Sequence, residues 1–276
     1  MVLATQLGYP WLDSAMAEGH AEAVERAFST QAAAFEDRRL HRVFTADIEW
    51  LFEHLALDPD HVVLDVAAGT GHAARCLAPS VRAVIALDVT AAMLEAGKVA
   101  AEESGLRNVI FLRGDAAALP FPDASFDVVV SRFAVHHFET PGEQLDEMVR
   151  CLRPAGQLVV ADLVANDDPA VACTQNQLEQ LRDPSHSRLL SARQLRDALE
   201  DLGVAAAGVE SREIERPLAP WLAQTHTSDA VSKQIMSALR SEINGGSLTG
   251  FSPRDQAGEV WFVQRFASVT ASKPRD

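Results

Sequence analysis

The sequence predicts an α/β protein with a doubly wound, mostly parallel sheet of seven strands, an antiparallel last strand and a helical lid. Short apolar segments alternate with helical patterns between residues 62 and 202. The last two strand candidates have no strand–helix–strand unit of the usual length between them, which favours an antiparallel closing strand. Helical patterns also precede the first strand and form two insertions, at residues 167–190 and 217–250.

Apolar runs and turn residues locate the individual elements. Thr90 is expected to cap a helix that ends near Gly105, and Ser191 a helix that ends just before Gly203. Two or three helices are expected between residues 21 and 57. The seven strand candidates are Val62–Val66, Val81–Val89, Val109–Leu112, Phe126–Ser131, Gln157–Leu163, Val204–Ile214 and Glu259–Thr270.

The 276 residues are expected to form a single domain. Residues 59–166 would be its ligand-binding core, with an N-terminal helical lid at 18–58 and lid insertions at 167–190 and 217–250. Ligands of open α/β sheets bind outside the carboxyl ends of the strands. We therefore expect the lid helices to cover that edge of the sheet.

Net charge and cysteine content indicate which partners, which cellular compartment and which metal sites to expect. The formal net charge is −15, which disfavours nucleic acid and anionic lipid as partners. No apolar run reaches membrane-spanning length, and residues 1–11 lack the pattern of a signal peptide. The three cysteines, Cys76, Cys151 and Cys173, fit a reducing compartment and have no metal-ligand spacing. We expect a cytoplasmic monomer or homodimer without a metal site.

Three acids stand at the ends of successive strands. Asp65 ends the first strand, before a loop of small residues; Asp88 ends the second and Asp115 follows the third. Each alone can be a cap or turn residue. Together they suit a ligand with a diol, an exocyclic amine and an ammonium group. Gly69–Ala74 also satisfies a relaxed G-x-G-x-x-A dinucleotide pattern with Asp88 as the ribose acid, so a dinucleotide-dependent oxidoreductase stays an alternative.

Five segments in this order resemble the Rossmann-like (class I) S-adenosylmethionine-dependent methyltransferases, particularly the ubiquinone/menaquinone-biosynthesis type. The helix at 28–35 also resembles the N-terminal helix of that family. The resemblance implies methyl transfer to an O, N or C atom of a small molecule. The five segments are Leu64–Gly71, Ala86–Leu94, Gly114–Phe121, Ser125–Phe138 and Leu152–Asp162.

The resemblance also implies roles for individual residues. Asp88 would bind the ribose hydroxyls, and Asp115 the adenine amine. This chain departs from the family at Ala67, where glycine is usual, at Ala155, where a Pro-Gly-Gly is usual, and at Phe35, where tyrosine is common. The full implied cofactor set is Asp65, Ala67, Gly69, Thr70, Gly71, Asp88, Val89, Met93, Gly114, Asp115, Ala116, Ser131 and Arg132.

Methyl transfer from a sulfonium depends mainly on positioning and water exclusion, and an acidic acceptor also needs a base, for which histidine is suited. His186, in the first insertion, is the preferred base. His136 is a second catalytic candidate, with a structural or cofactor-orienting role equally open. The expected substrate-binding residues are Phe28, Phe35, His137 and Trp221. A methyltransferase fold that binds S-adenosylmethionine without transfer is a further alternative.

Overall fold

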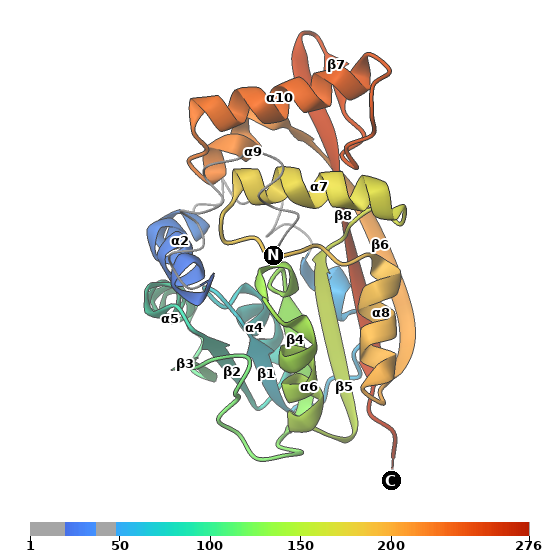
Figure 1. Ribbon diagram of the computed structural model, residues 1–276. Coiled ribbons are helices and arrows are strands. Elements are labelled where there is room, and N and C mark those ends of the chain that lie inside the picture. Colours follow the sequence, from blue (N-terminus) through green and yellow to red (C-terminus); the bar gives the residue numbers. More distant parts are fainter. Residues whose placement is uncertain (1–19, 37–47, 276) are drawn as a thin grey trace.

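The computed structural model describes residues 20–36 and 48–275 and contains one sheet of eight strands (Figure 1). The strand order is β3-β2-β1-β4-β5-β8-β6, and β7 pairs with β8 outside this path. Neighbours from β3 to β5 are parallel, whereas β8 is antiparallel to both β5 and β6. The strands are β1 Val62–Val66, β2 Ala83–Asp88, β3 Val109–Arg113, β4 Phe126–Arg132, β5 Leu152–Leu163, β6 Ala205–Pro217, β7 Arg254–Gln256 and β8 Glu259–Ser272.

This topology confirms the predicted α/β class and the antiparallel last strand. The eighth strand is a difference from the sequence prediction. β7 is a polar three-residue strand joined to β8 by Ala257 and Gly258, whose φ angles are 54° and 91°. Two-residue hairpin turns with positive φ at both positions are favoured by strand twist, but the usual signal is Asn-Gly or Asp-Gly. The pair Ala-Gly gave no such signal.

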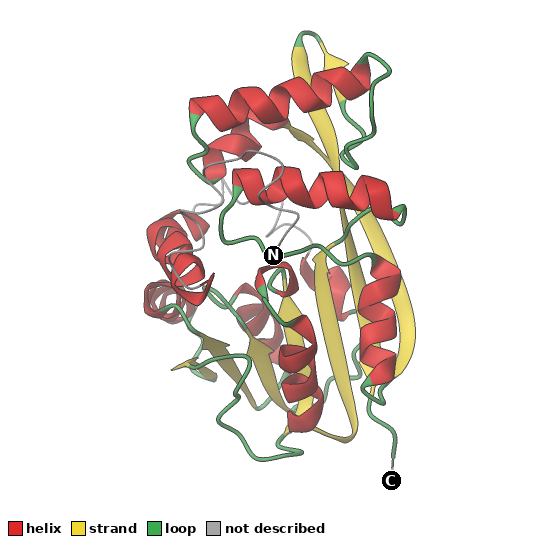
Figure 2. Cartoon of the chain, in the orientation of Figure 1, coloured by secondary structure: helices red, strands yellow, loops and turns green. Residues whose placement is uncertain are grey.

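Helices cover both faces of the sheet (Figure 2). Alternate strand residues point to opposite faces, so Val63 packs with η1 and α4 while Leu64 packs with α6 and α8. Ser191 caps α8 with a capping box, as its sequence position predicts. The helices are α2 His20–Phe35, η1 Ile48–Phe52, α4 His72–Leu77, η2 Ala78–Ser80, α5 Ala91–Glu103, η3 Val135–His137, α6 Pro141–Cys151, α7 Pro169–Arg182, α8 Ala192–Asp201, α9 Leu218–Gln224 and α10 Asp229–Ile243.

The lid segments have their own small core. Trp221 of α9 packs against Phe251 and Phe262, with ring centroids 5.6 and 4.9 Å away. Ile235 and Leu239 of α10 complete this buried cluster. In Figure 1, α7, α9 and α10 stand above the main body of the sheet, and the long strand β8 rises to meet them. The boundaries proposed for lid and core remain predictions, and the part of the N-terminal lid at 18–19 and 37–47 lies outside the described residues.

Every helix within residues 20–36 and 48–275 is too short or too polar to cross a bilayer.

Candidate active site

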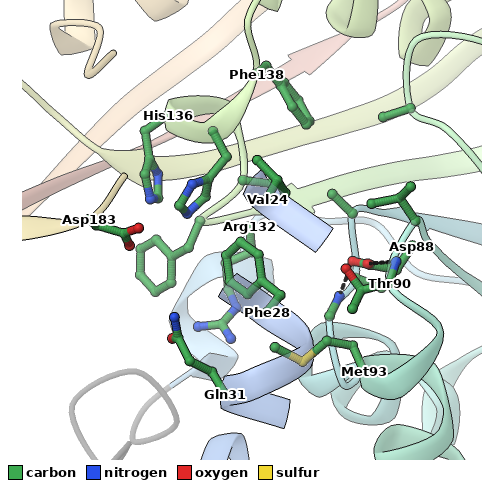
Figure 3. A pocket seen from close by; sticks show the side chains of 18 of the residues that line it. Val24, Phe28, Gln31, Asp88, Thr90, Met93, Arg132, His136, Phe138 and Asp183 are labelled. Carbon is green, nitrogen blue, oxygen red and sulfur yellow. Dashed lines mark hydrogen bonds between the residues drawn. The ribbon is translucent and has the colours of Figure 1, made fainter. Parts of the chain in front are cut away.

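A cavity of about 440 Å³ opens where the carboxyl ends of β1, β2, β3 and β4 meet (Figure 3). Its volume lies within the range of roughly 300–1,000 Å³ that is common for small-molecule sites. The loops that follow these four strands form one side of the cavity. Helix α2 and residues of the lid segments form the other. The fold therefore places the cavity at the edge of the sheet that the sequence predicts.

The loop after β1 turns sharply at the base of the cavity. Ala67, Gly69 and Gly71 have φ angles of 53°, 57° and 73°, a region that costs a non-glycine residue roughly 1–2 kcal/mol. Ala67, Gly69 and Thr70 line the cavity, whereas Gly71 lies outside its lining. A Cβ atom at Gly71 would approach Phe111 Cε1 to 2.9 Å, so glycine is needed there for packing.

Asp65 lies beneath this loop, outside the cavity lining. Its Oδ2 accepts a hydrogen bond from the backbone N–H of Ala74, at 2.9 Å. Burial raises the pKa of Asp65 to about 7. Asp65 belongs to the cofactor set that the resemblance implies, but this position does not bring it into the cavity lining. Asp65 instead fixes the loop to the start of α4.

Asp88, at the end of β2, lines the cavity and shapes its rim (Figure 3). Its Oδ2 accepts from the N–H of Gly69 and its Oδ1 from the N–H of Thr90, both at 2.8 Å. Burial raises the pKa of Asp88, although the hydrogen bonds from Thr90 and Gly69 oppose this shift. Each oxygen retains a lone pair beyond these bonds, so the carboxylate can also accept ligand hydroxyls.

Three buried polar atoms of the lining have no hydrogen-bond partner among the described residues. They are Oγ1 of Thr70, Oε1 of Gln144, a residue on the buried face of α6, and Nε1 of Trp221 in the lid. The same lining includes Asp115, which is exposed and accepts from the N–H of Ala117, and Ala116. Unsatisfied buried groups of this kind are rare in native proteins unless a ligand or water binds them. The polar lining therefore fits an adenosyl ligand. Gln144 was missed in the sequence, where its only signal is a polar side chain on an apolar helix face.

Four histidines gather beside the cavity. The ring centroid of His136 is 4.0 Å from that of His137 and 5.4 Å from that of His186. His137 Nδ1 faces the carbonyl oxygen of Ser185 at 2.9 Å, so Nδ1 must carry the proton. Burial, followed by the charge of His136, lowers the pKa of His137 to about 4. His20 of α2 contacts the carbonyl oxygen of His137 through Nε2, at 2.7 Å.

His136 forms a buried pair with Asp162 at the end of β5. His136 Nδ1 is 2.6 Å from Asp162 Oδ1, and Asp162 Oδ2 accepts the backbone N–H of His136 at 2.7 Å. Burial alone would lower the pKa of His136, but the Asp162 carboxylate outweighs it and the pKa is raised. Asp162 was missed as a site residue. Its signal was present, because it is a further acid at the carboxyl end of a strand.

Two other predicted residues lie outside the cavity lining. His186 is buried behind His136, with Nε2 3.3 Å from Asn176 Oδ1, and burial lowers its pKa. A substrate-side base needs access to the acceptor, so the structure does not support that role for His186. The hydroxyl of Ser131 is also buried and has no partner within the described part of the chain. The predicted residues that do line the cavity include Val89, Met93, Gly114, Arg132, His136, His137 and Trp221.

Helix α2 closes one side of the cavity with Phe28 and Phe35, as expected for substrate-side residues. Phe28 packs edge-on against His137, with ring centroids 4.9 Å apart. Polar contacts attach this helix to the cofactor-side elements. Glu25 pairs with Arg113 at the end of β3, at 2.7 Å, and Glu36, just past the helix, pairs with Arg75 of α4, also at 2.7 Å.

This arrangement predicts that a bound adenosyl ligand will stabilise the lid. Because α2 and α9 contribute to the lining, ligand contacts should reduce their local opening. Amide hydrogen exchange of residues 20–36 and 217–250 is expected to slow when S-adenosylhomocysteine is added. Helix α8, which lies outside the lining, serves as the internal control. Equal rates in the lid segments with and without saturating ligand would contradict the lid assignment.

Gly97 provides a test of the packing behind the cofactor loop. A Cβ atom at Gly97 would collide with the carbonyl oxygen of Thr70 and lie 2.6 Å from Phe111 Cε1. Gly97→Ala should therefore lower the free energy of unfolding by about 1–3 kcal/mol, the usual cost of overpacking, and weaken S-adenosylhomocysteine binding. Denaturant unfolding and titration calorimetry measure the two effects. Gly142→Ala, in open space on α6, is the matched control. Wild-type behaviour of Gly97→Ala would show that the loop is free to move.

The fold and the cavity together define a Rossmann-like α/β protein with a small-molecule cavity at the carboxyl edge of its sheet. Comparisons with known proteins narrow this class. Residues 64–160 match the family described as a methyltransferase domain. The chain is 32% identical to the uncharacterized methyltransferase YcgJ of Bacillus subtilis, over 78% of this chain and 85% of that protein. It is also 32% identical to the ubiquinone/menaquinone biosynthesis C-methyltransferase UbiE of Hahella chejuensis, over 61% and 69% of the two chains.

Solved structures agree with this result. The crystal structure of YcgJ from Bacillus subtilis superposes with a TM-score of 0.76 at 30% identity, covering 82% of this chain and 97% of that one. A putative methyltransferase from Bacillus halodurans gives a TM-score of 0.77 at 28% identity, covering 83% and 99%. The chain belongs to the family of S-adenosylmethionine-dependent methyltransferases. Neither alternative, the dinucleotide oxidoreductase or the fold without methyl transfer, finds support in these comparisons.

Proposed function

We propose that this chain methylates a small molecule enclosed between the cofactor loops and the lid helices, with His136 as the proton acceptor. One observation supports the proposal most strongly. A single cavity is lined by the loops after β1, β2, β3 and β4 on one side, by α2 and α9 on the other, and by the His136 side chain. Such an enclosed site excludes water and orients two reactants, which is what methyl transfer requires of a protein.

The residues of the cofactor side would hold S-adenosylmethionine. Asp88 would accept the ribose hydroxyls, and Asp115 with the backbone of Ala116 would bind the adenine edge. Val89 and Met93 would pack against the adenine ring, and the loop from Ala67 to Thr70 would approach the methionine end. When bound, this cofactor supplies a methyl group on a sulfonium leaving group. Asp65 and Gly71 would contribute by shaping the loop rather than by direct contact.

His136 would remove a proton from the acceptor through Nε2. Its Nδ1 faces the Asp162 carboxylate, which keeps Nδ1 protonated and fixes the ring orientation. Nε2 is therefore the basic atom when the ring is neutral. In this proposal His136 takes the role that the sequence favoured for His186, with Asp162 as its positioning residue.

The size and nature of the acceptor follow from the enclosure. A cavity of about 440 Å³ behind lid helices admits a small molecule but no folded protein or duplex. The net charge of −15 also disfavours a nucleic acid substrate. The relative from Hahella chejuensis is named a C-methyltransferase, which makes carbon a candidate acceptor atom alongside oxygen and nitrogen. A cytoplasmic location, consistent with three free cysteines, is part of the proposal.

Transfer of a labelled methyl group tests the proposal. The protein is incubated with methyl-labelled S-adenosylmethionine and a cell extract, and the products are separated into small molecules, protein and nucleic acid. We expect label in the small-molecule fraction only, and its loss in His136→Gln. Label found mainly in protein or nucleic acid would contradict a small-molecule acceptor.

A further inference from the structure

Nitrogen donors gather on the lid side of the cavity. The lining there includes Arg182 at the end of α7, Trp221 and Gln224 of α9, and Gln264 of β8. Gln264 is unusual because its neighbours on the same face of β8, Phe262 and Phe266, are buried and apolar. It is itself only 5% exposed. Buried polar side chains are normally fully hydrogen-bonded, so the partners of this group decide what it can bind.

Arg216 fixes the orientation of the two amides. This buried guanidinium donates from Nη1 to Gln264 Oε1 at 2.6 Å and from Nη2 to Gln224 Oε1 at 2.9 Å. A guanidinium has donors only, so the oxygen of each amide must face it. The Nε2 group of Gln264 is therefore turned away from Arg216 and can act only as a donor.

Arg182 and Trp221 hold each other in place. Arg182 Nε donates to the carbonyl oxygen of Trp221 at 3.2 Å, and the guanidinium lies 4.3 Å from the centroid of the Trp221 ring. Arg182 Nη1 contacts Glu179 at 3.3 Å. The buried Trp221 Nε1 has no partner among the described residues. The hydrogen bonds of Arg182 to described residues come from Nε and Nη1, which leaves its Nη2 group available to a ligand. The lid side of the cavity thus presents several fixed donors.

Among the described residues, the nearby carboxylates do not accept hydrogen bonds from Arg182 Nη2 or Trp221 Nε1. Two buried carboxylates lie close to this group, Glu179 and Asp183. Glu179 already contacts Arg182, and burial raises its pKa. Asp183 accepts from the N–H and the hydroxyl of Ser185 through Oδ1, at 3.0 and 2.6 Å, and lies beside His136 in Figure 3. The guanidiniums of Arg182 and Arg216 repel each other and favour a further anion.

We propose that the methyl acceptor carries a carboxylate, which binds to Arg182 Nη2, Trp221 Nε1 and Gln264 Nε2. This inference rests on the proposed function and adds the chemical class of its substrate. A carboxylate has two oxygens in one plane and about four lone-pair sites, so it can accept from a guanidinium and from neutral donors together. The remainder of the molecule would lie against the apolar side chains of Phe28, Phe133 and Leu163, toward His136.

Paired ligands of the same shape, in which a neutral amide replaces the carboxylate, test this inference. Protein saturated with S-adenosylhomocysteine is titrated by calorimetry with a series of aryl and alkyl carboxylates and with the carboxamide of each. We expect the wild-type protein to bind at least one acid about tenfold or more tightly than its amide, since charge-assisted bonds are roughly twice as strong as neutral ones. Arg182→Gln should abolish this preference while leaving S-adenosylhomocysteine affinity unchanged.

Two further variants make the test specific. Arg188→Gln removes an exposed arginine of the loop that follows α7, outside the cavity lining, and should keep the preference. Trp221→Phe keeps an aromatic side chain but removes the N–H donor, and should reduce the preference by a smaller factor even if Arg182→Gln fails to fold. No acid binding more tightly than its amide, or full preference in Arg182→Gln, overturns the inference. Failure of the wild-type protein to bind S-adenosylhomocysteine would instead contradict the proposed function.

Discussion

Asp88→Ala is expected to weaken the binding of S-adenosylmethionine and S-adenosylhomocysteine together by about 10- to 1000-fold, because both contain the ribose that Asp88 would hold. Hydrogen bonds to a charged group contribute about 1.5–3 kcal/mol each, and every 1.4 kcal/mol is a factor of ten in affinity. The variant also loses the acceptors for the N–H groups of Gly69 and Thr90, which adds to the effect. Titration calorimetry gives the dissociation constants.

Two related variants separate ligand contact from loop support. Asp88→Asn keeps one oxygen acceptor and should fall between the wild-type protein and Asp88→Ala. Asp115→Ala should weaken the same ligands through the adenine amine, whereas Asp123→Ala, at an exposed position further along the same β3–β4 loop, should not. If Asp115→Ala binds normally in a folded protein, the adenine has been placed wrongly. Wild-type affinity in both Asp88→Ala and Asp115→Ala would place the cofactor elsewhere.

His136→Gln is expected to lower kcat by about 10²- to 10⁴-fold with little change in cofactor affinity, since general base catalysis contributes about that factor. His54→Gln, at an exposed position, is the matched control and should retain activity. Once an acceptor is known, the rate of methyl transfer measures the effect. Near-wild-type turnover in His136→Gln would return the His136–Asp162 pair to a purely structural role.

The pH profile gives this prediction a second readout. His136 acts as a base only when neutral, and Asp162 raises its pKa above the usual 6.5. Activity should therefore fall as the pH drops below that raised pKa. Asp162→Asn removes the charge that raises the pKa of His136, so the effect of burial would dominate and this pKa would fall. The acidic limb of the pH profile would then move to lower pH. If the acidic limb of the pH profile stays at the same pH in Asp162→Asn, a group other than His136 determines it.

The stability contributed by the His136–Asp162 pair depends on pH in the opposite direction to the activity. A group whose pKa is raised on folding binds its proton more tightly in the folded state. The contribution is therefore fully present below the unfolded pKa near 6.5 and is lost as the pH rises through the higher folded pKa. The melting temperature of the wild-type protein should therefore decrease as the pH rises from the unfolded pKa through the folded pKa of His136. The melting temperature of Asp162→Asn should not show this decrease.

The strand-end loops could be predicted because their signals are local. Asp88 and Asp115 follow apolar strands directly, and parallel strands bring their carboxyl ends to one edge whatever the details of packing. The same reasoning should have included Asp162, which ends β5. Its role could not be predicted because the partner of Asp162 is a histidine 26 residues earlier in the chain, which only the fold brings to the end of β5.

Features that depend on the pairing of residues far apart in the sequence were not predictable. Arg216 and Gln264 meet only because β6 and β8 pair antiparallel in one particular register, with Arg216 opposite Phe262 and Ile214 opposite Gln264. His186 shows the reverse case. Its place in a lid insertion suggested access to the substrate, but the loop after α7 folds back so that the backbone of Ser187 bonds the carbonyl oxygen of His136. His186, the base that the sequence favoured, is thereby buried behind His136.

A crystal structure of the chain with bound S-adenosylhomocysteine would show directly where the cofactor binds. We expect the ribose hydroxyls to lie within hydrogen-bonding distance of Asp88, the adenine to lie beside Asp115 and Ala116, and the sulfur to face the part of the cavity lined by His136. A ligand bound outside this cavity, or bound in it with the adenine on the side of Arg182 and Trp221, would contradict both the cofactor placement and the role of His136.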